Sequence, residues 1–222
     1  MIRALIMDFD GLILDTEVPA FQSWDEIFEA HGCSLPLTAW AAWVGGSPDM
    51  FDPYEYLEAQ LGRAVDREDI RQKQRRREAE LIEAQPILSG VEDYIADAKR
   101  LGLKLGLASS SDREWVMRHL SRLGLAADFD CIKCLDDVKR AKPDPELYLS
   151  VLDALDVSAD QALALEDSPH GISAAQEAGI FCVVVPNPLT RQLPTDHADL
   201  RLNSLADVPL EELLLQVEKR SR

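Results

Sequence analysis

The stretch Ile2-Arg3-Ala4-Leu5-Ile6-Met7-Asp8-Phe9-Asp10-Gly11 decides the fold of this chain. Its apolar half predicts a short buried strand, of the kind found in the centre of a parallel sheet. Ligands of an open α/β sheet bind beyond the carboxyl ends of its strands, so Asp8 and Asp10 are predicted to face a ligand. Two neighbouring carboxylates at such a place need a cation. Alone, however, an acid pair after a strand is more often part of a turn or a helix cap.

The same pattern of an apolar run followed by polar residues recurs along the chain. Residues 103–108 lead into Ser109-Ser110-Ser111, and residues 162–165 lead into Glu166-Asp167-Ser168. A weaker strand is predicted at 130–135, and Lys142 follows it just before a proline-rich helix start. Helical periodicity separates these strands at 90–101, 112–123, 145–155 and 169–179. Alternating strands and helices predict an α/β fold with a parallel sheet.

The polar residues after these strands are expected to meet in space. Right-handed crossovers bring the ends of parallel strands to one edge of the sheet. Each residue also has an ordinary interpretation, because Ser109 can cap a helix, Lys142 can be exposed, and acids often end a strand. Four such coincidences on separate strands favour one shared site instead. Its members would be Asp8, Asp10, Ser109, Lys142, Glu166 and Asp167.

These motifs together resemble the four motifs of the haloacid dehalogenase superfamily. They are Asp8-Phe9-Asp10-Gly11 with Asp15-Thr16, then Ser109, then Lys142-Pro143, then Glu166-Asp167-Ser168. The small residues of 171–179 resemble the helix that follows the fourth motif in the β-phosphoglucomutase-like phosphatase branch. The resemblance implies a Rossmann-like core with an inserted helical cap, Mg²⁺ dependence, and phosphoryl transfer from a small phosphorylated metabolite through an aspartyl phosphate.

The chemistry of the side chains agrees with that implication. Phosphoryl transfer needs a nucleophile, a proton donor for the leaving oxygen and positive charge near the phosphate. Asp8 would attack phosphorus, and Asp10 would protonate the leaving oxygen and then activate water. Ser109 would donate its hydroxyl to a phosphate oxygen, while Lys142 would neutralise the phosphate and the Asp8 carboxylate.

A magnesium site is expected beside the nucleophile. Mg²⁺ prefers oxygen ligands in octahedral geometry and keeps several waters. Asp8, Asp167 and the backbone carbonyl of Asp10 would bind the ion directly, and Glu166 would support it through water.

The cap is expected at residues 16–86, between core segments 1–15 and 87–222. Three or four helices are predicted there, among them 17–31 and 66–84, without a core strand. Its substrate loop would be Val44-Gly45-Gly46-Ser47-Pro48, because glycines permit a close backbone approach. The expected substrate-binding residues are Thr16, Gly45, Gly46, Ser47 and Ser110.

Other residues near the predicted cap leave alternatives open. Trp24, Trp40 and Trp43 flank the loop and are expected to form cap core rather than a substrate platform. The basic run at 71–77 is typical of a solvated helix face, although Lys73, Arg76 and Arg77 share one side and could meet a second anionic group. His170 follows the fourth motif and is expected either at the site border or on the surface.

Departures from the β-phosphoglucomutase pattern favour hydrolysis over isomerisation. Ala20 and Pro48 stand where that pattern has a histidine and an arginine. A mutase therefore stays an alternative, while dehalogenase chemistry is disfavoured because dehalogenases usually lack an acid at the Asp10 position. A phosphoaspartate receiver domain would be far shorter and would not keep Asp10.

The composition limits which binding partners and which cellular location are expected. The formal charge of −17, from 40 acidic and 23 basic residues, disfavours nucleic acid and anionic membranes. The first apolar run is too short for a signal peptide, so a cytoplasmic protein is expected. Four cysteines in 222 residues imply no disulfide framework, and Cys131 and Cys134 are expected to be buried strand residues rather than a metal site. The oligomeric state is open.

Overall fold

A six-stranded parallel sheet forms the centre of the molecule. The computed structural model describes residues 1–41, 44 and 51–220. The strands lie in the order β3-β2-β1-β4-β5-β6. Their bounds are β1 Ala4–Met7, β2 Lys104–Ala108, β3 Cys131–Lys133, β4 Ala162–Glu166, β5 Phe181–Val184 and β6 Leu200–Arg201.

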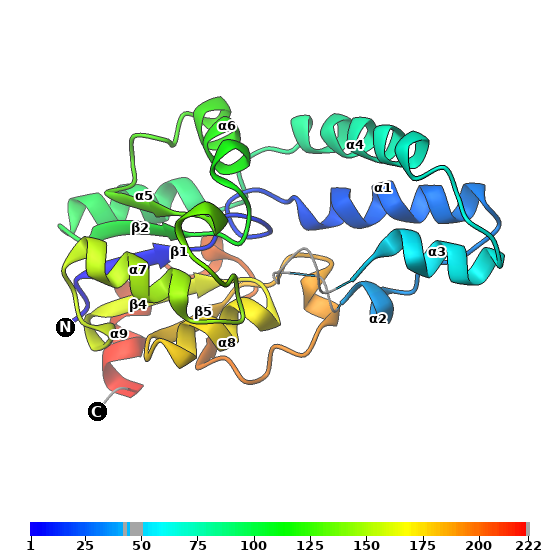
Figure 1. Cartoon of the computed structure of the whole chain (residues 1–222). Helices are drawn as coiled ribbons and strands as arrows, with labels where there is room; N and C mark the ends of the chain where they lie inside the picture. The colour runs from blue at the N-terminus through cyan, green and yellow to red at the C-terminus, as the bar shows by residue number, and fades with distance from the viewer. Residues whose placement is uncertain (42–43, 45–50, 221–222) are drawn as a thin grey trace.

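Helices connect and cover the strands (Figure 1). They are α1 Glu17–Ala30, α2 Leu37–Trp40, α3 Pro53–Leu61, α4 Arg67–Glu83, α5 Val91–Arg100, α6 Arg113–Leu123, α7 Glu146–Leu155, α8 Pro169–Glu177 and α9 Leu210–Arg220. The predicted α/β fold with a parallel sheet is confirmed.

Strand β1 is buried on both faces. It pairs in parallel with β2 and β4, so that Leu5 lies opposite Leu105 and Leu163. Because side chains alternate along a strand, Leu5 and Met7 pack with α5, α6 and α9, whereas Ala4 and Ile6 pack with α7 and α8. This two-sided burial explains the uninterrupted apolar run in the sequence. Because β1 ends at Met7, Asp8 is the first residue beyond the strand's carboxyl end.

Helices α1 to α4 follow β1 and form a separate group beside the sheet (Figure 1). Trp24, Phe28, Trp40 and Leu57 are buried in one cluster, which also includes Leu189 and Leu193 from the segment after β5. Helices α1 and α4 are also joined through Arg77, whose guanidinium binds Glu26 at 2.9 and 3.0 Å. No strand occurs among the described residues of 16–86. The division into core and cap at residues 15/16 and 86/87 stays a prediction.

Among the described residues, no helix combines the length and apolarity that crossing a bilayer requires. Cys33, Cys131, Cys134 and Cys182 are all free thiols.

Candidate active site

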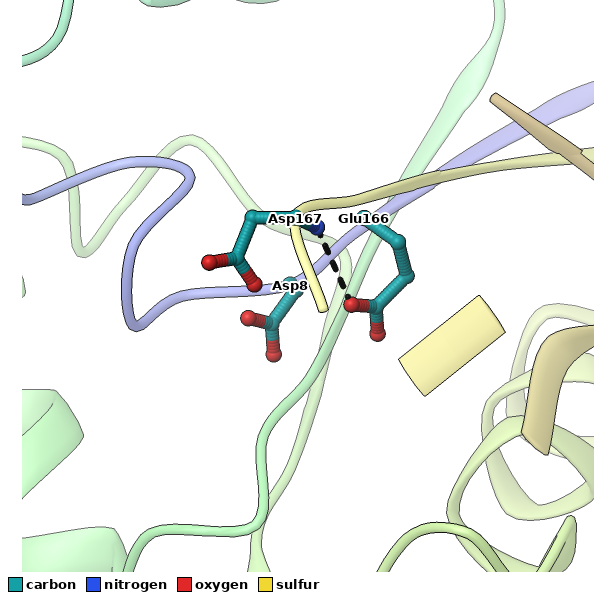
Figure 2. A group of neighbouring side chains, drawn as sticks. All are labelled: Asp8, Glu166 and Asp167. Atoms are coloured by element: carbon teal, nitrogen blue, oxygen red, sulfur yellow. Dashed lines mark hydrogen bonds between the residues drawn. The ribbon is translucent and has the colours of Figure 1, made fainter. Parts of the chain in front are cut away.

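The polar residues that follow β1, β2 and β4 meet at the carboxyl edge of the sheet. The Lys142 ammonium reaches them from the connection between β3 and α7, with Nζ 2.6 Å from both Asp8 Oδ1 and Glu166 Oε1. Lys142 is only 1 % exposed, so this contact takes place away from bulk water. Figure 2 shows Asp8 beside Asp167, with the Glu166 carboxylate turned back to the Asp167 backbone N–H.

In the described part of the chain, four hydrogen-bond donors hold Glu166. Oε1 accepts from Lys142 and from the Tyr148 hydroxyl, both at 2.6 Å. Oε2 accepts from the Asp167 N–H at 3.2 Å and from Ser168 Oγ at 3.4 Å. The carboxylate therefore fixes Lys142 in place, in addition to any support of a metal. Tyr148 was not anticipated from the sequence, where it is one apolar-face residue of a helix.

Asn187 holds Asp167 from the other side. Its Nδ2 donates to Asp167 Oδ2 at 2.8 Å and to the Gly11 carbonyl at 3.4 Å. Its Oδ1 accepts from two backbone N–H groups, at Leu189 and Thr190, which orients the amide. Asn187 was also missed, although it follows the apolar run of β5 in the same way as the other site residues follow their strands.

The buried carboxylates carry more negative charge than one lysine can balance. Burial raises the pKa of Asp8 to about 8, against the opposing effect of Lys142. The pKa of Asp167 is also raised, by burial and then by the Asp8 charge. Burial alone would lower the pKa of Lys142, but Asp8 and Glu166 raise it, so the ammonium stays charged.

This donor set fits a divalent cation. Asp8, Glu166 and Asp167 each offer an oxygen, and these atoms lie within 4.8 Å of one another. Oxygen ligands suit hard cations such as Mg²⁺ and Ca²⁺. A bound dication would offset the uncompensated charge that raises the two aspartate pKa values.

The Asp10 carboxylate lies beside this cluster and accepts four hydrogen bonds from the described residues. Oδ1 accepts from Thr16 Oγ1 at 2.9 Å and from Trp115 Nε1 at 3.0 Å. Oδ2 accepts from Ser109 Oγ at 3.2 Å and from Ser111 Oγ at 2.7 Å. Ser109 and Thr16 therefore contact Asp10 in this arrangement, and neither Ser111 nor Trp115 was anticipated.

A cavity of about 1070 Å³ opens over Asp8, Asp10 and Lys142. Ser110 lines it, and its Oγ is buried without a hydrogen-bond partner in the described part of the chain. On the side of α1 and α4, the lining includes Glu17 and Glu78. Burial raises the pKa of each of these two carboxyls.

The arginines that line the cavity are not those suggested by the sequence pattern. Arg67, Arg71 and Arg75 line it, spaced four residues apart on one side of α4. Lys73 instead pairs with Asp69, Arg76 lies 4.0 Å from Glu80, and Arg77 binds Glu26. The cause is the rotation of α4, which buries Gln74 against Ser23 and so turns 73, 76 and 77 away from the cavity.

The other expectations for the cap have mixed outcomes. Trp24 and Trp40 belong to the buried cap cluster and also line the cavity. His170 is partly buried, and its Nδ1 lies 3.1 Å from the Val44 carbonyl. The remaining expected positions lie outside the described residues; they are Trp43, Gly45, Gly46, Ser47 and Pro48.

Comparisons with known proteins agree with this geometry. A family model described as haloacid dehalogenase-like hydrolase matches residues 5–185. YhcW of Bacillus subtilis, whose name assigns it provisionally as a phosphatase, is 49 % identical over 96 % of this chain and 97 % of its own length. A phosphorylated carbohydrates phosphatase of Thermotoga maritima is 30 % identical over 96 % of both chains. The crystal structure of a β-phosphoglucomutase from Clostridium difficile superposes with a TM-score of 0.74 at 26 % identity, covering 99 % of this chain and 98 % of that one.

Proposed function

We propose that this chain dephosphorylates a small phosphorylated carbohydrate through a phosphoaspartate on Asp8. The chain belongs to the haloacid dehalogenase-like hydrolase family and is a phosphoric monoester hydrolase. The observation that carries the proposal is the buried group of Asp8, Lys142 and Asp167, of which Asp8 and Lys142 line the large cavity. The carbohydrate is suggested by the Thermotoga maritima relative, whose name specifies such substrates.

Asp8 is the proposed nucleophile. Its Oδ1 is held by Lys142, while Oδ2 accepts no hydrogen bond from the described residues and is the oxygen proposed to attack. A new bond forms between this oxygen and phosphorus as the ester P–O bond breaks, which divides one displacement into two steps. Lys142 offsets the repulsion between the carboxylate and the incoming phosphate.

Asp10 is the proposed acid and base. It gives a proton to the leaving alkoxide in the first step and takes one from the attacking water in the second. Water then hydrolyses the phosphoaspartate, so Asp8 is regenerated and inorganic phosphate is released. Ser109 and Ser110 are proposed to donate to phosphate oxygens, with Thr16 near the substrate.

Asp8 and Asp167, with the Asp10 backbone carbonyl, are proposed to hold Mg²⁺, with Glu166 acting through water. The ion, when bound, supplies positive charge that stabilises the phosphate during transfer. Asn187 keeps Asp167 turned toward that position through its 2.8 Å hydrogen bond.

The cavity favours a small polar leaving group. Its lining mixes carboxyl groups at Glu17 and Glu78 with the indole of Trp24, an arrangement suited to hydroxyl groups and the apolar face of a sugar. Nucleic acid is not proposed as a substrate, because the net charge of −17 would repel it. A cytoplasmic location stays a prediction from the sequence, as do the roles of Gly45, Gly46 and Ser47.

The test is phosphate release from a panel of hexose, pentose and hexitol phosphates and 4-nitrophenyl phosphate. We expect activity with Mg²⁺ and none after EDTA is added. Activity with Ca²⁺ should be weaker, because its looser coordination would misplace the nucleophile. Asp8→Asn should lower kcat at least roughly a thousandfold, because the amide forms no phosphoenzyme. Asp153→Asn, on the exposed side of α7, is the matched control. Full activity in EDTA, or steady turnover by Asp8→Asn, would refute the mechanism.

A further inference from the structure

We propose that Trp115 is a positioning residue that sets the rotation of the Asp10 carboxyl group for proton transfer, an inference that rests on the phosphatase mechanism above. Trp115 lies in the first turn of α6 and lines the cavity. Its indole N–H donates to Asp10 Oδ1 at 3.0 Å. The contact joins residues 105 positions apart, so it depends on the packing of α6 against the end of β1.

The indole differs in kind from the other three donors to Asp10. Thr16, Ser109 and Ser111 use hydroxyls, which can donate or accept, whereas an indole N–H only donates. Oδ1 must therefore stay an acceptor toward Trp115 when the carboxyl group is protonated. The acidic proton is then placed on Oδ2, whose serine partners can turn to accept it.

The position of the indole is determined from two sides. The α6 N-cap residue Asp112 accepts from the Trp115 backbone N–H at 2.7 Å, which fixes where the side chain begins. Behind the ring, His119 packs edge-to-face at a centroid distance of 4.4 Å and an interplanar angle of 67°. His119 in turn stacks at 6.4 Å on Phe9, the residue between Asp8 and Asp10.

The surroundings of His119 show that it serves as an aromatic support. It is 2 % exposed, and neither ring nitrogen has a hydrogen-bond partner in the described part of the chain. Buried polar atoms without partners are rare and need an explanation. Here the ring fills the space between Phe9 and Trp115, so the stack connects the backbone of the first motif to the indole that orients Asp10.

If Trp115 orients Asp10, Trp115→Phe should lower kcat/KM by an amount that depends on the leaving group. General-acid help matters most for a basic leaving oxygen and least for one that departs readily as an anion. We would measure kcat/KM of wild type and Trp115→Phe for 2,4-dinitrophenyl, 4-nitrophenyl, phenyl and 4-methoxyphenyl phosphates with Mg²⁺. Phenylalanine keeps the aromatic contact but removes the N–H. The expected loss is about tenfold for the 4-methoxyphenyl ester and below about twofold for the dinitrophenyl ester.

A second pair of variants tests the support behind the indole. His119→Ala should give the same leaving-group-dependent loss, because the indole can then tilt into the vacated space. His119→Phe should restore the wild-type ratio between the esters, since the ring and not its nitrogens is used. The ratio is insensitive to poor folding, because a smaller folded fraction lowers kcat/KM for every ester equally.

The outcomes separate the two proposals. If wild type releases phosphate with Mg²⁺ from none of the four esters and from none of the sugar phosphates, the proposed function fails. If wild type is active and Trp115→Phe changes all esters equally or not at all, only the role of Trp115 is refuted. Should Trp115→Phe yield no folded protein, the His119 pair decides: a loss in His119→Ala that is equal for all esters refutes the inference.

Discussion

At the scale of single residues, the site depends on close approaches that only glycine allows. A Cβ at Gly171 would lie 1.9 Å from Glu166 Oε2, and one at Gly11 would lie 2.2 Å from Asp167 Oδ2. Gly11 also has φ of +81°, where other residues are strained. Both glycines therefore bring backbone against the carboxylates, and Gly171 does so within the first turn of α8.

Gly171→Ala is expected to displace Glu166 from Lys142 and Tyr148. We expect kcat to fall at least about tenfold and the free energy of unfolding to fall by about 2–4 kcal/mol, because nothing near the carboxylate can yield without losing a hydrogen bond. Urea unfolding and ester hydrolysis measure the two effects. The control is Gly102→Ala, whose Cβ meets nothing within 4 Å and which should cost only about 1 kcal/mol through its positive φ, with kcat unchanged. Wild-type turnover by Gly171→Ala would contradict this account.

At the scale of the elements, helix α6 contributes more to the site than its N-terminus near Ser109. One turn of this helix carries Trp115 toward Asp10 and His119 toward the core. Burial, and then Arg122 and Arg118, lower the pKa of His119 from its ordinary value of 6.5. The folded protein therefore keeps this imidazole neutral under conditions where the unfolded chain begins to protonate it.

This difference predicts a pH-dependent stability. Because the pKa is lower in the folded state, the unfolded chain takes up the proton first as pH falls through about 6.5, and stability is lost toward lower pH. His119→Phe removes that proton uptake. The drop in melting temperature between about pH 7.5 and about pH 5.5 should be smaller in His119→Phe than in wild type. Burial also lowers the pKa of His170, but this residue is present in both proteins. Equal drops in both proteins would show that His119 is not responsible.

At the scale of the whole molecule, the cap wall determines what happens to the phosphorylated enzyme. A mutase must hold a bisphosphate in two orientations, and so it needs cationic contacts for the phosphate that is not reacting. Ala20 lines the cavity where the β-phosphoglucomutase pattern has a histidine. Of the three arginines that line it, Arg67 and Arg71 are paired with Glu58 and Glu68, so Arg75 is the one without an ion-pair partner among the described residues.

Hydrolysis is therefore expected to outpace isomerisation. With β-glucose 1-phosphate and a bisphosphate primer, phosphate release should exceed the formation of glucose 6-phosphate, which a glucose-6-phosphate dehydrogenase assay reports. Primed isomerisation faster than phosphate release would overturn this prediction. Loss of that isomerisation in Arg75→Ala would then identify the cation that holds the second phosphate, because Arg75 lines the cavity without an ion-pair partner among the described residues.

Four of the strands, β1 to β4, and the residues that meet at their carboxyl ends can be predicted from the sequence, whereas β5 and β6 were not predicted. Once 4–7, 104–108 and 162–166 are parallel strands, Asp8, Ser109 and Asp167 must lie together, because parallel strands end at one edge whatever their exact angles. Strand β6 was not predicted because its two residues are too few to show any periodicity. Helix α9 was not predicted either, and it lies beyond the last motif.

Which side chains orient that group depends on packing between segments that are distant in sequence. Tyr148, Asn187 and Trp115 reach Glu166, Asp167 and Asp10 through the rotation of α7 and α6 and the path of the chain after β5. The rotation of α4 likewise places Arg75, and not Arg76 or Arg77, on the cavity. Hydrophobic periodicity locates the buried face of a helix, but a turn of one residue moves a side chain by about 100°. That angle is fixed by packing between segments distant in sequence, so local pattern does not contain it.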